Sequence, residues 1–228
     1  MAILMRRLIT LLVFGLPACR VKNMLLRWLG HSIGDSVHIS PCFVDNVGRF
    51  EIGQGVQIGF GNMFRGLNLV SLGERTIIGK FNSVSAGKVF LNGEDDRGVL
   101  RLGDHAAIVS RHVIDCSGGV FLDEFALLGG LRSILITHQV DYRTGALAVD
   151  RITIGAYSLV NSCNLFSPGA SVPARCITAL GAVIVAGLEA EGRLYGGVPA
   201  RNIKAVEGLW FERTTGRIAD LPAEPTAS

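Results

Sequence analysis

Residues 154–183 read IGAYSL VNSCNL FSPGAS VPARCI TALGAV, and they decide the fold because they repeat every six residues. The first position of each unit is apolar or β-branched: Ile154, Val160, Phe166, Val172 and Thr178. The fifth position is small or polar: Ser158, Asn164, Ala170, Cys176 and Ala182. One such strand and turn cannot bury its own apolar side. Three units make a triangular coil, and stacked coils bury a continuous aliphatic column.

The same phase recurs upstream in shorter runs, which begin at Ile33, Ile52, Leu72, Leu102 and Leu122. In the last run, Ile134 is an inward-facing rung, which puts His138 at a fifth position. Slips between the runs predict loops near 45–51, 68–71, 92–101, 120–121 and 142–153. A doubly wound α/β sheet would need helical patterns of ten or more residues between strands, and none is found between 32 and 188.

The sequence therefore predicts an all-β solenoid with three parts. Residues 1–30 are an N-terminal amphipathic helical segment, 31–206 form the β-helix, and 207–228 form a short C-terminal helix and a flexible tail.

Composition fits this prediction. The 228 residues are 49% hydrophobic, which allows a large core, and they include 29 Gly but only 7% aromatic residues. That combination is typical of short strands joined by tight turns. A net charge of +3 is too weak to indicate nucleic-acid binding. The five Cys form no CxxC pair and no zinc spacing, so we expect a reduced, cytoplasmic protein without a metal site.

The N-terminal stretch MRRLITLLVFGLPACRVKNMLLRWLG (5–30) is basic and amphipathic. Its apolar run Leu8–Leu16 is about half of what a membrane-spanning helix requires. Three interpretations remain open at this point: a cap on the core, a segment resting on an anionic membrane surface, or a secretion signal.

Three segments resemble the hexapeptide-repeat acyltransferases: GGVFLDEFALLGGLRSILITHQVD (118–141), ITIGAYSLVNSCNLFSPGASVPARCITALGAVIV (152–185) and YGGVPARNIKAV (195–206). The resemblance covers roughly Leu29–Val206, and its best match is to sugar O-acetyltransferases of the maltose/galactoside and polysaccharide-modifying type. It implies a left-handed parallel β-helix, acetyl-CoA as co-substrate, a sugar or glycan acceptor, and a homotrimer with active sites between subunits.

His138 is the central candidate residue. Taken alone, it can be a structural histidine of the coil, a metal ligand or a catalytic base, although one histidine without partners cannot build a metal site. The family's Thr-His followed by an acid three residues later resembles the THQVD stretch here. That resemblance implies a general base, a role that suits an imidazole. Asp141 is the expected orienting carboxylate, and Asp123, which should stack one coil below it, is the alternative.

Other candidates line the two substrates. The resemblance implies that Asp115 lines the acceptor pocket, and we place His112 in the same cleft. Ser162 and Leu180 lie eighteen residues apart, so we expect them to stack on adjacent coils where the family contacts the pantetheine arm. Arg201 and Lys204 follow in VPARNIK, and the family places basic residues there near the coenzyme A phosphates.

We therefore expect an acetyl-CoA-dependent O-acetyltransferase that acts on a sugar hydroxyl in polysaccharide or glycan biosynthesis. It would be cytoplasmic, with membrane association at the inner face left open. The alternatives are N-acetylation of an amino-sugar nucleotide, or a non-catalytic β-helix scaffold. A carbonic-anhydrase-like β-helix needs several histidine ligands on neighbouring coils, and the pattern does not supply them.

Overall fold

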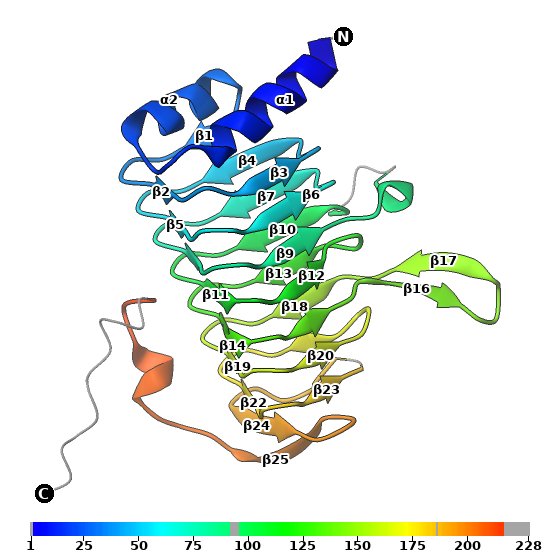
Figure 1. Cartoon of the computed structure of the whole chain (residues 1–228). Coiled ribbons are helices and arrows are strands. Elements are labelled where there is room, and N and C mark those ends of the chain that lie inside the picture. The colour runs from blue at the N-terminus through cyan, green and yellow to red at the C-terminus, as the bar shows by residue number, and fades with distance from the viewer. Residues whose placement is uncertain (1, 92–95, 186, 217–228) are drawn as a thin grey trace, which may run out of the picture.

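The structure is a computed structural model that describes residues 2–91, 96–185 and 187–216. It is a left-handed parallel β-helix with two helices at its N-terminal end, as Figure 1 shows, so the predicted fold class is confirmed. The helices are α1 (Ala2–Gly15) and α2 (Arg20–Trp28). The predicted C-terminal helix is a short 3₁₀ turn, η2 (Leu209–Glu212), and most of the predicted tail lies outside the described residues.

Three sheets form the faces of the prism. The first contains β1 (Ser32–Ile33), β4 (Arg49–Ile52), β7 (Leu69–Leu72), β10 (Val99–Leu102), β13 (Val120–Leu122), β18 (Ile152–Ile154) and β21 (Ser171–Val172). The second contains β2 (His38–Ile39), β5 (Gln57–Ile58), β8 (Ile77–Ile78), β11 (Ala107–Ser110), β14 (Leu127–Leu131), β19 (Leu159–Val160), β22 (Ile177–Thr178), β24 (Arg193–Gly196) and β25 (Arg201–Ala205).

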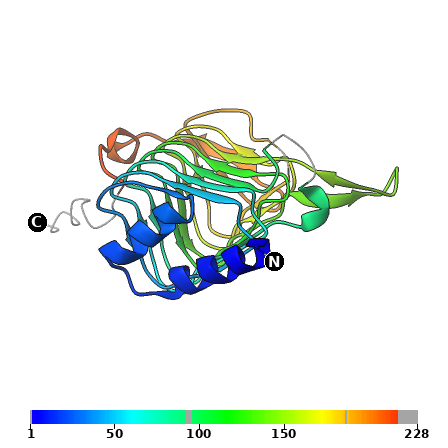
Figure 2. The same ribbon diagram turned by 90° about the horizontal axis from the view of Figure 1, so that it is seen from above.

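The third sheet contains β3 (Phe43–Asp45), β6 (Met63–Arg65), β9 (Ser83–Ser85), β12 (Val113–Asp115), β15 (Ile134–Leu135), β20 (Leu165–Phe166) and β23 (Val183–Ile184). Neighbouring strands in the three sheets are parallel, except that β25 returns antiparallel to β24. A separate antiparallel hairpin, β16 (His138–Asp141) and β17 (Ala146–Val149), projects from one corner of the prism (Figure 2).

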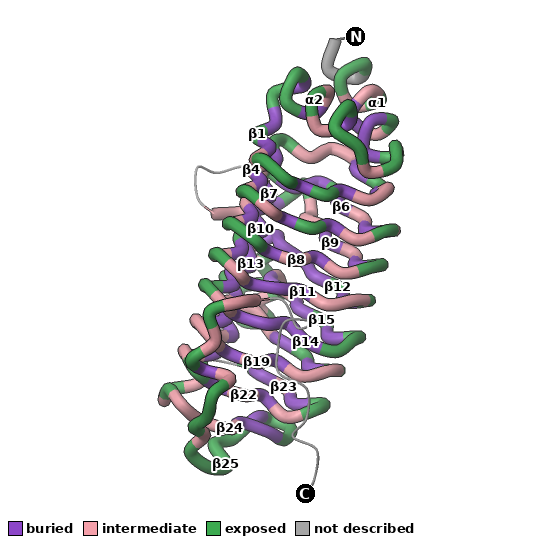
Figure 3. Tube along the Cα trace, turned by 90° about the vertical axis from the view of Figure 1, so that its left-hand side faces the viewer, coloured by how far each residue is buried: buried purple, intermediate pink, exposed green. Residues whose placement is uncertain are grey.

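The six-residue repeat sets the register of the last coils. Ile154 pairs with Val172, Val160 with Thr178, and Phe166 with Ile184. Residues eighteen apart in the sequence therefore lie one above the other on successive coils. All six of these side chains are buried, and buried stretches recur at the same place in successive coils (Figure 3). Burying an aliphatic side chain of this kind stabilises the fold by about 1.5–3 kcal/mol. The small fifth-position residues are also buried at the corners: Ser158, Asn164, Ala170, Cys176 and Ala182.

One predicted rung is wrong. Ile134 is 38% exposed, whereas Leu135 is fully buried and pairs with Ile114 below and Phe166 above. The cause is a bulge in β14, where the pairing with β11 shifts between Leu128 and Leu131. A bulge places extra residues on one strand and moves every later side chain along by one position. His138 is therefore not at the fifth position of its unit.

The N-terminal helices cap the core, which was one of the three expected roles. Phe14 and Leu26 are fully buried in the aliphatic column. The ammonium of Lys22 is also buried, and its Nζ donates to the carbonyls of Phe14, at the end of α1, and of Ile39, in the first coil, at 2.8 and 3.0 Å. Burial lowers the pKa of Lys22 to about 8, while the nearby Cys42 and Cys19 act in the opposite direction. At neutral pH the charged amine thus ties the two helices to the first coil.

Two buried histidines are neutral members of this core. His31 accepts a hydrogen bond from the Phe50 amide at Nδ1, and His112 accepts one from the Ser133 amide. Burial lowers the pKa of both imidazoles from 6.5 to about 4, and Arg6 and Arg49 add to the effect at His31. The backbone of Gly130 acts in the opposite direction and raises the pKa of His112, but burial has the larger effect.

These histidines predict how stability depends on pH. Between pH 6.5 and 4 the unfolded chain binds protons that the folded chain does not, so the free energy of unfolding falls as the pH falls through this window. For His112 the loss reaches roughly 3 kcal/mol below pH 4. Urea unfolding at neutral pH and at pH 4.5 should show a smaller loss for His112→Asn, which keeps the acceptor for Ser133. Equal losses in the variant and the wild type would contradict this account.

Candidate active site

His138 lies where the chain leaves the third sheet and enters the hairpin. It is the first residue of β16, and its side chain is 41% exposed, so the ring is accessible from solvent. Its Nδ1 lies 2.9 Å from Oδ2 of Asp115. The two residues come from adjacent coils: β12 pairs with β15 so that Ile114 lies beside Leu135. The end of β12 therefore lies directly beneath the segment that leads into His138.

The carboxylate of Asp115 is held by a complete set of donors. Ser117 Oγ donates to Oδ1 at 2.6 Å, and Thr137 donates to Oδ2 from its hydroxyl at 2.6 Å and from its amide at 2.9 Å. The Ser117 hydroxyl in turn accepts from the Gly87 amide, and the Thr137 hydroxyl accepts from the Gly118 amide. The Thr137 hydroxyl also lies 3.0 Å from the Asp115 carbonyl, but its contact with the charged carboxylate is shorter. This network fixes the position of Asp115 before any ligand arrives.

The same contacts keep Asp115 ionised. Burial alone would raise the pKa of its carboxyl, but the hydrogen bonds from Ser117, Thr137 and His138 outweigh it, and the pKa lies below its ordinary value. An ionised carboxylate only accepts hydrogen bonds, so His138 must carry its proton on Nδ1. The lone pair of Nε2 is then free on the accessible side of the ring, which is the state a general base requires.

An aromatic ring covers one side of His138. Phe90 lies with its ring centroid 5.1 Å from that of His138, at an interplanar angle of 32°. Phe90 belongs to a 3₁₀ turn, η1 (Lys88–Phe90), in the long connection between β9 and β10. At the base of the hairpin, the Asp150 amide donates to the Thr137 carbonyl. The imidazole is thus confined by two excursions from the coil.

The structure assigns different positions to the other predicted residues around His138. Asp141 is half-buried at the end of β16, where it accepts from the Arg143 amide and the Thr144 hydroxyl. Asp123 does not lie beneath Asp141, because the strand that it follows, β13, pairs with β18 instead. His112 is buried inside the coil and offers no surface for an acceptor. Asp115, which was expected in the acceptor pocket, is the carboxylate that contacts His138.

The four residues expected to bind the cofactor lie elsewhere on the prism. Ser162 and Leu180 stack as expected, because Val160 pairs with Thr178 and the Gly181 amide donates to the Ser162 carbonyl. Both lie at the corner between the second and third sheets, whereas His138 lies at the corner between the third and first. The Ser162 hydroxyl accepts a hydrogen bond from the Leu131 amide, and it therefore supplies an acceptor for a backbone N–H at the bulge of β14.

Arg201 and Lys204 lie at the C-terminal end of the coil, on β25, and both are exposed. Arg201 lines a hollow of about 280 Å³ together with Glu189 and Tyr195. In a single chain these cations therefore belong to a different end of the prism from His138.

Three residues at the site were not singled out from the sequence: Ser117, Thr137 and Phe90. Ser117 and Thr137 each lie within two residues of a predicted site residue. A hydroxyl beside Asp115 or His138 in the sequence was therefore the feature that could have identified them. Phe90 had no signal, because it lies in a loop outside the repeat. Among the described residues, no three His, Cys, Asp or Glu side chains come together to hold a metal ion. The five cysteines are all free.

Comparisons with known proteins identify the fold. No model of a known protein family matches the chain, and no curated protein matches it. A mutant of AntD, an N-acyltransferase from Bacillus cereus in complex with dTDP and coenzyme A, is 16% identical over 83% of this chain and 92% of that chain, with a TM-score of 0.51. A second AntD mutant, in complex with dTDP-4-amino-4,6-dideoxyglucose and coenzyme A, is 15% identical over 86% and 94%, also at 0.51.

The polySia specific acetyltransferase NeuO is 16% identical over 77% of this chain and 75% of that chain, with a TM-score of 0.47. At 15–16% identity, the likeness to the two AntD structures establishes the fold alone. The resemblance to hexapeptide-repeat acyltransferases is thus confirmed as a shared fold, and the maltose/galactoside type is not singled out.

The donor network predicts that Asp115 is important for stability as well as for position. Asp115→Ala leaves the Thr137 amide and two hydroxyls without their acceptor, which should lower the free energy of unfolding by about 2–4 kcal/mol. Asp141→Ala is the matched control, because it removes a carboxylate of the projecting hairpin, away from the core, and should cost less than about 1 kcal/mol. Urea unfolding measures both. Equal losses would show that the network around Asp115 contributes nothing.

Proposed function

We propose that the protein is an acetyl-CoA-dependent O-acetyltransferase that transfers an acetyl group to a sugar hydroxyl in polysaccharide or glycan biosynthesis. The observation that carries the proposal is the accessible His138 whose Nδ1 bonds to the ionised Asp115. That pair is a positioned general base, and a hydroxyl needs one because it is a poor nucleophile until its proton is removed. The shared fold with an N-acyltransferase that binds coenzyme A supports the choice of acyl donor.

The chain's own residues suffice for the proton transfers. Nε2 of His138 takes the hydroxyl proton as the sugar oxygen attacks the thioester carbonyl. Asp115 stabilises the imidazolium that forms, without itself becoming protonated, because its pKa lies below its ordinary value. The same imidazolium then returns the proton to the departing coenzyme A thiolate. The acetyl ester and the free thiol are the products, and the base is regenerated.

The donor side of the proposal rests on a second subunit. His138 and the corner of Ser162 and Leu180 lie on different edges of one prism, so a site that needs both is built most directly between neighbouring copies. A homotrimer satisfies this requirement with closed symmetry. Leu180 is an exposed apolar residue suited to the pantetheine arm, and the exposed Arg201 and Lys204 are suited to the phosphates of coenzyme A.

Acylation of an amino-sugar nucleotide is the second candidate, because AntD acts on nitrogen and was crystallised with such a sugar. The His138–Asp115 pair favours the hydroxyl. A non-catalytic scaffold is the third candidate, and binding of coenzyme A would be evidence against it. We propose a cytoplasmic location, where acetyl-CoA is available. In the described part of the chain, no helix is long and apolar enough to cross a bilayer.

Variants of the pair test the mechanism. His138→Ala should lower kcat for acetyl transfer by at least about 10²-fold, and Asp115→Asn by about 10²–10⁴-fold, because the base is removed or left in the wrong tautomer. Asp141→Asn is the control and should remain close to wild type. Acetyl transfer to a panel of sugars is followed by mass spectrometry of the products.

Thermal stabilisation by coenzyme A accompanies this assay, and it should be unchanged in His138→Ala. Full activity of His138→Ala would disprove the base assignment. Loss of both activity and stabilisation would indicate misfolding, which unfolding curves detect. If only amino sugars become acylated, the second candidate function replaces the first.

Mixed oligomers test the shared site. His138→Ala and Arg201→Glu subunits are each expected to be nearly inactive as pure oligomers. Co-expressed as mixed trimers, they should recover part of the activity, because some interfaces then combine an intact His138 with an intact Arg201 from the neighbour. Mixtures that stay as inactive as the parents would contradict a site built from two subunits.

A further inference from the structure

The helical cap exposes a set of apolar side chains that the core does not bury. At α1 they follow helical spacing and are exposed: Met5, Leu8 and Leu12 on the helix, and Leu16 directly after its end. On α2 they are Val21, Met24 and Trp28. Leu12 is 70% exposed and Trp28 is 79% exposed, whereas Phe14 and Leu26 on the opposite sides of the same helices are fully buried. The cap therefore has two apolar faces, and the β-helix uses only one of them.

Charge is distributed unevenly along the chain. The first 34 residues contain five Lys and Arg and no Asp or Glu, whereas the rest contains 17 Lys and Arg against 19 Asp and Glu. Lys22 is buried, but Arg6, Arg20 and Arg27 are exposed on the cap. The end of the prism that exposes the apolar side chains is thus its positive end, while the remainder is close to neutral.

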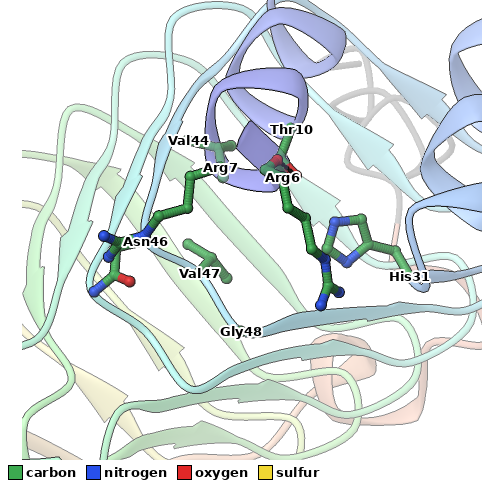
Figure 4. A pocket seen from close by; sticks show the side chains of 8 residues that line it. All are labelled: Arg6, Arg7, Thr10, His31, Val44, Asn46, Val47 and Gly48. Atoms are coloured by element: carbon green, nitrogen blue, oxygen red, sulfur yellow. Dashed lines mark hydrogen bonds between the residues drawn. The ribbon is translucent and has the colours of Figure 1, made fainter. Parts of the chain in front are cut away.

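A hollow of about 200 Å³ lies beside α1, where the helix crosses the turn between β3 and β4. Figure 4 shows Arg6 beside the ring of His31 and Arg7 extending toward Asn46, with Val47 and Gly48 below. Arg6 gives one donor to the Leu29 carbonyl and keeps others free. Arg7 has no hydrogen bond or ion pair to any described residue.

His31 supplies an independent indication of the ligand. Its side chain lines the hollow, the residue is only 5% exposed, and its Nε2 has no partner among the described residues. Since Nδ1 accepts from the Phe50 amide, the hydrogen of the neutral ring is on Nε2. Two guanidinium groups and an unpaired N–H are all donors. Such a set suits an anionic oxygen group such as a phosphate.

We propose that the helical cap docks the protein on an anionic phospholipid bilayer. The exposed apolar side chains of α1 and α2 enter the boundary between headgroups and acyl chains, and the hollow of Arg6, Arg7 and His31 holds a lipid phosphate. The helices lie in the plane of the interface. Each is too short to span the hydrocarbon layer: α1 has 14 residues, about 21 Å, against a layer of about 30 Å.

Charge distinguishes this occupant from a second copy of the chain. Face-to-face contact of two caps would bring together two clusters of Arg. Arg27 is paired with Asp35 at 3.5 Å, but Arg6, Arg7 and Arg20 make no ion pair with a described residue, so their repulsion opposes the contact. An anionic bilayer attracts the same cluster, by about 1 kcal/mol for each exposed Lys or Arg. The coil then stands on the membrane. Asp115 lies in the fourth strand of its sheet, which puts the candidate active site about 15 Å above the first coil.

Vesicle sedimentation of the full chain tests the proposal and does not depend on acyl transfer. Vesicles of phosphatidylcholine with phosphatidylglycerol should bind the protein, and vesicles of phosphatidylcholine alone should bind it much more weakly. Leu12→Gln should weaken binding by more than about ten-fold and Arg7→Gln by about five-fold. The matched controls are Leu209→Gln and Arg75→Gln, at exposed positions outside the cap, and they should bind like the wild type.

Fluorescence adds a readout of depth. Emission of the wild type should shift to the blue on anionic vesicles and be quenched by brominated acyl chains, and both changes should disappear in Trp28→Phe while binding persists. Three outcomes would overturn the proposal: no binding to anionic vesicles, equal binding to both kinds of vesicle, or equal effects of the cap variants and their controls. Loss of self-association in Leu12→Gln, measured by sedimentation velocity without lipid, would identify the surface as a subunit interface instead.

Discussion

The structure depends on one constraint: each coil must return the chain to the same place in the stack. A rung such as Ile154 is buried only if Leu122 lies below it and Val172 above it, and the backbone pairs only if the strands are in register. Residues beyond the eighteen that a coil requires have nowhere to go inside the column. They must leave it as a loop at a corner or as a bulge in a strand.

The candidate active site is built from these extra residues. The connection between β9 and β10 carries Phe90, and the hairpin β16–β17 begins with His138. Both excursions leave from the corner between the third and first sheets, and Asp115 ends the strand between them in the stack. The regular coil thus supplies a rigid carboxylate, while the irregular segments supply the base and the ring that confines it. A repeat protein can place ionisable groups here without disturbing its core.

The sequence predicted the fold because one residue type per position repeats in phase over the coils. The eighteen-residue spacing of the coils also correctly predicted that Ser162 and Leu180 lie one above the other. It did not predict the bulge at Gly129 and Gly130, so Ile134 was assigned to the core in place of Leu135. The partner of His138 was missed for a related reason. Asp141 is near in sequence, but Asp115 is near in space because strands whose paired residues are twenty-one apart lie side by side. The exposed apolar face of the cap could not be predicted either, because an amphipathic pattern does not determine which of two apolar sides packs on the core.

The central claim is that the His138–Asp115 pair activates a sugar hydroxyl toward a coenzyme A thioester. The most direct measurement is transfer of radiolabelled acetyl from acetyl-CoA to a glycan acceptor, followed by mild alkali, which cleaves esters and leaves amides intact. We expect labelled product with the wild-type protein, release of the label by alkali, and no labelled product with His138→Ala. Label that resists alkali, or that His138→Ala transfers as fast as the wild type, would contradict it.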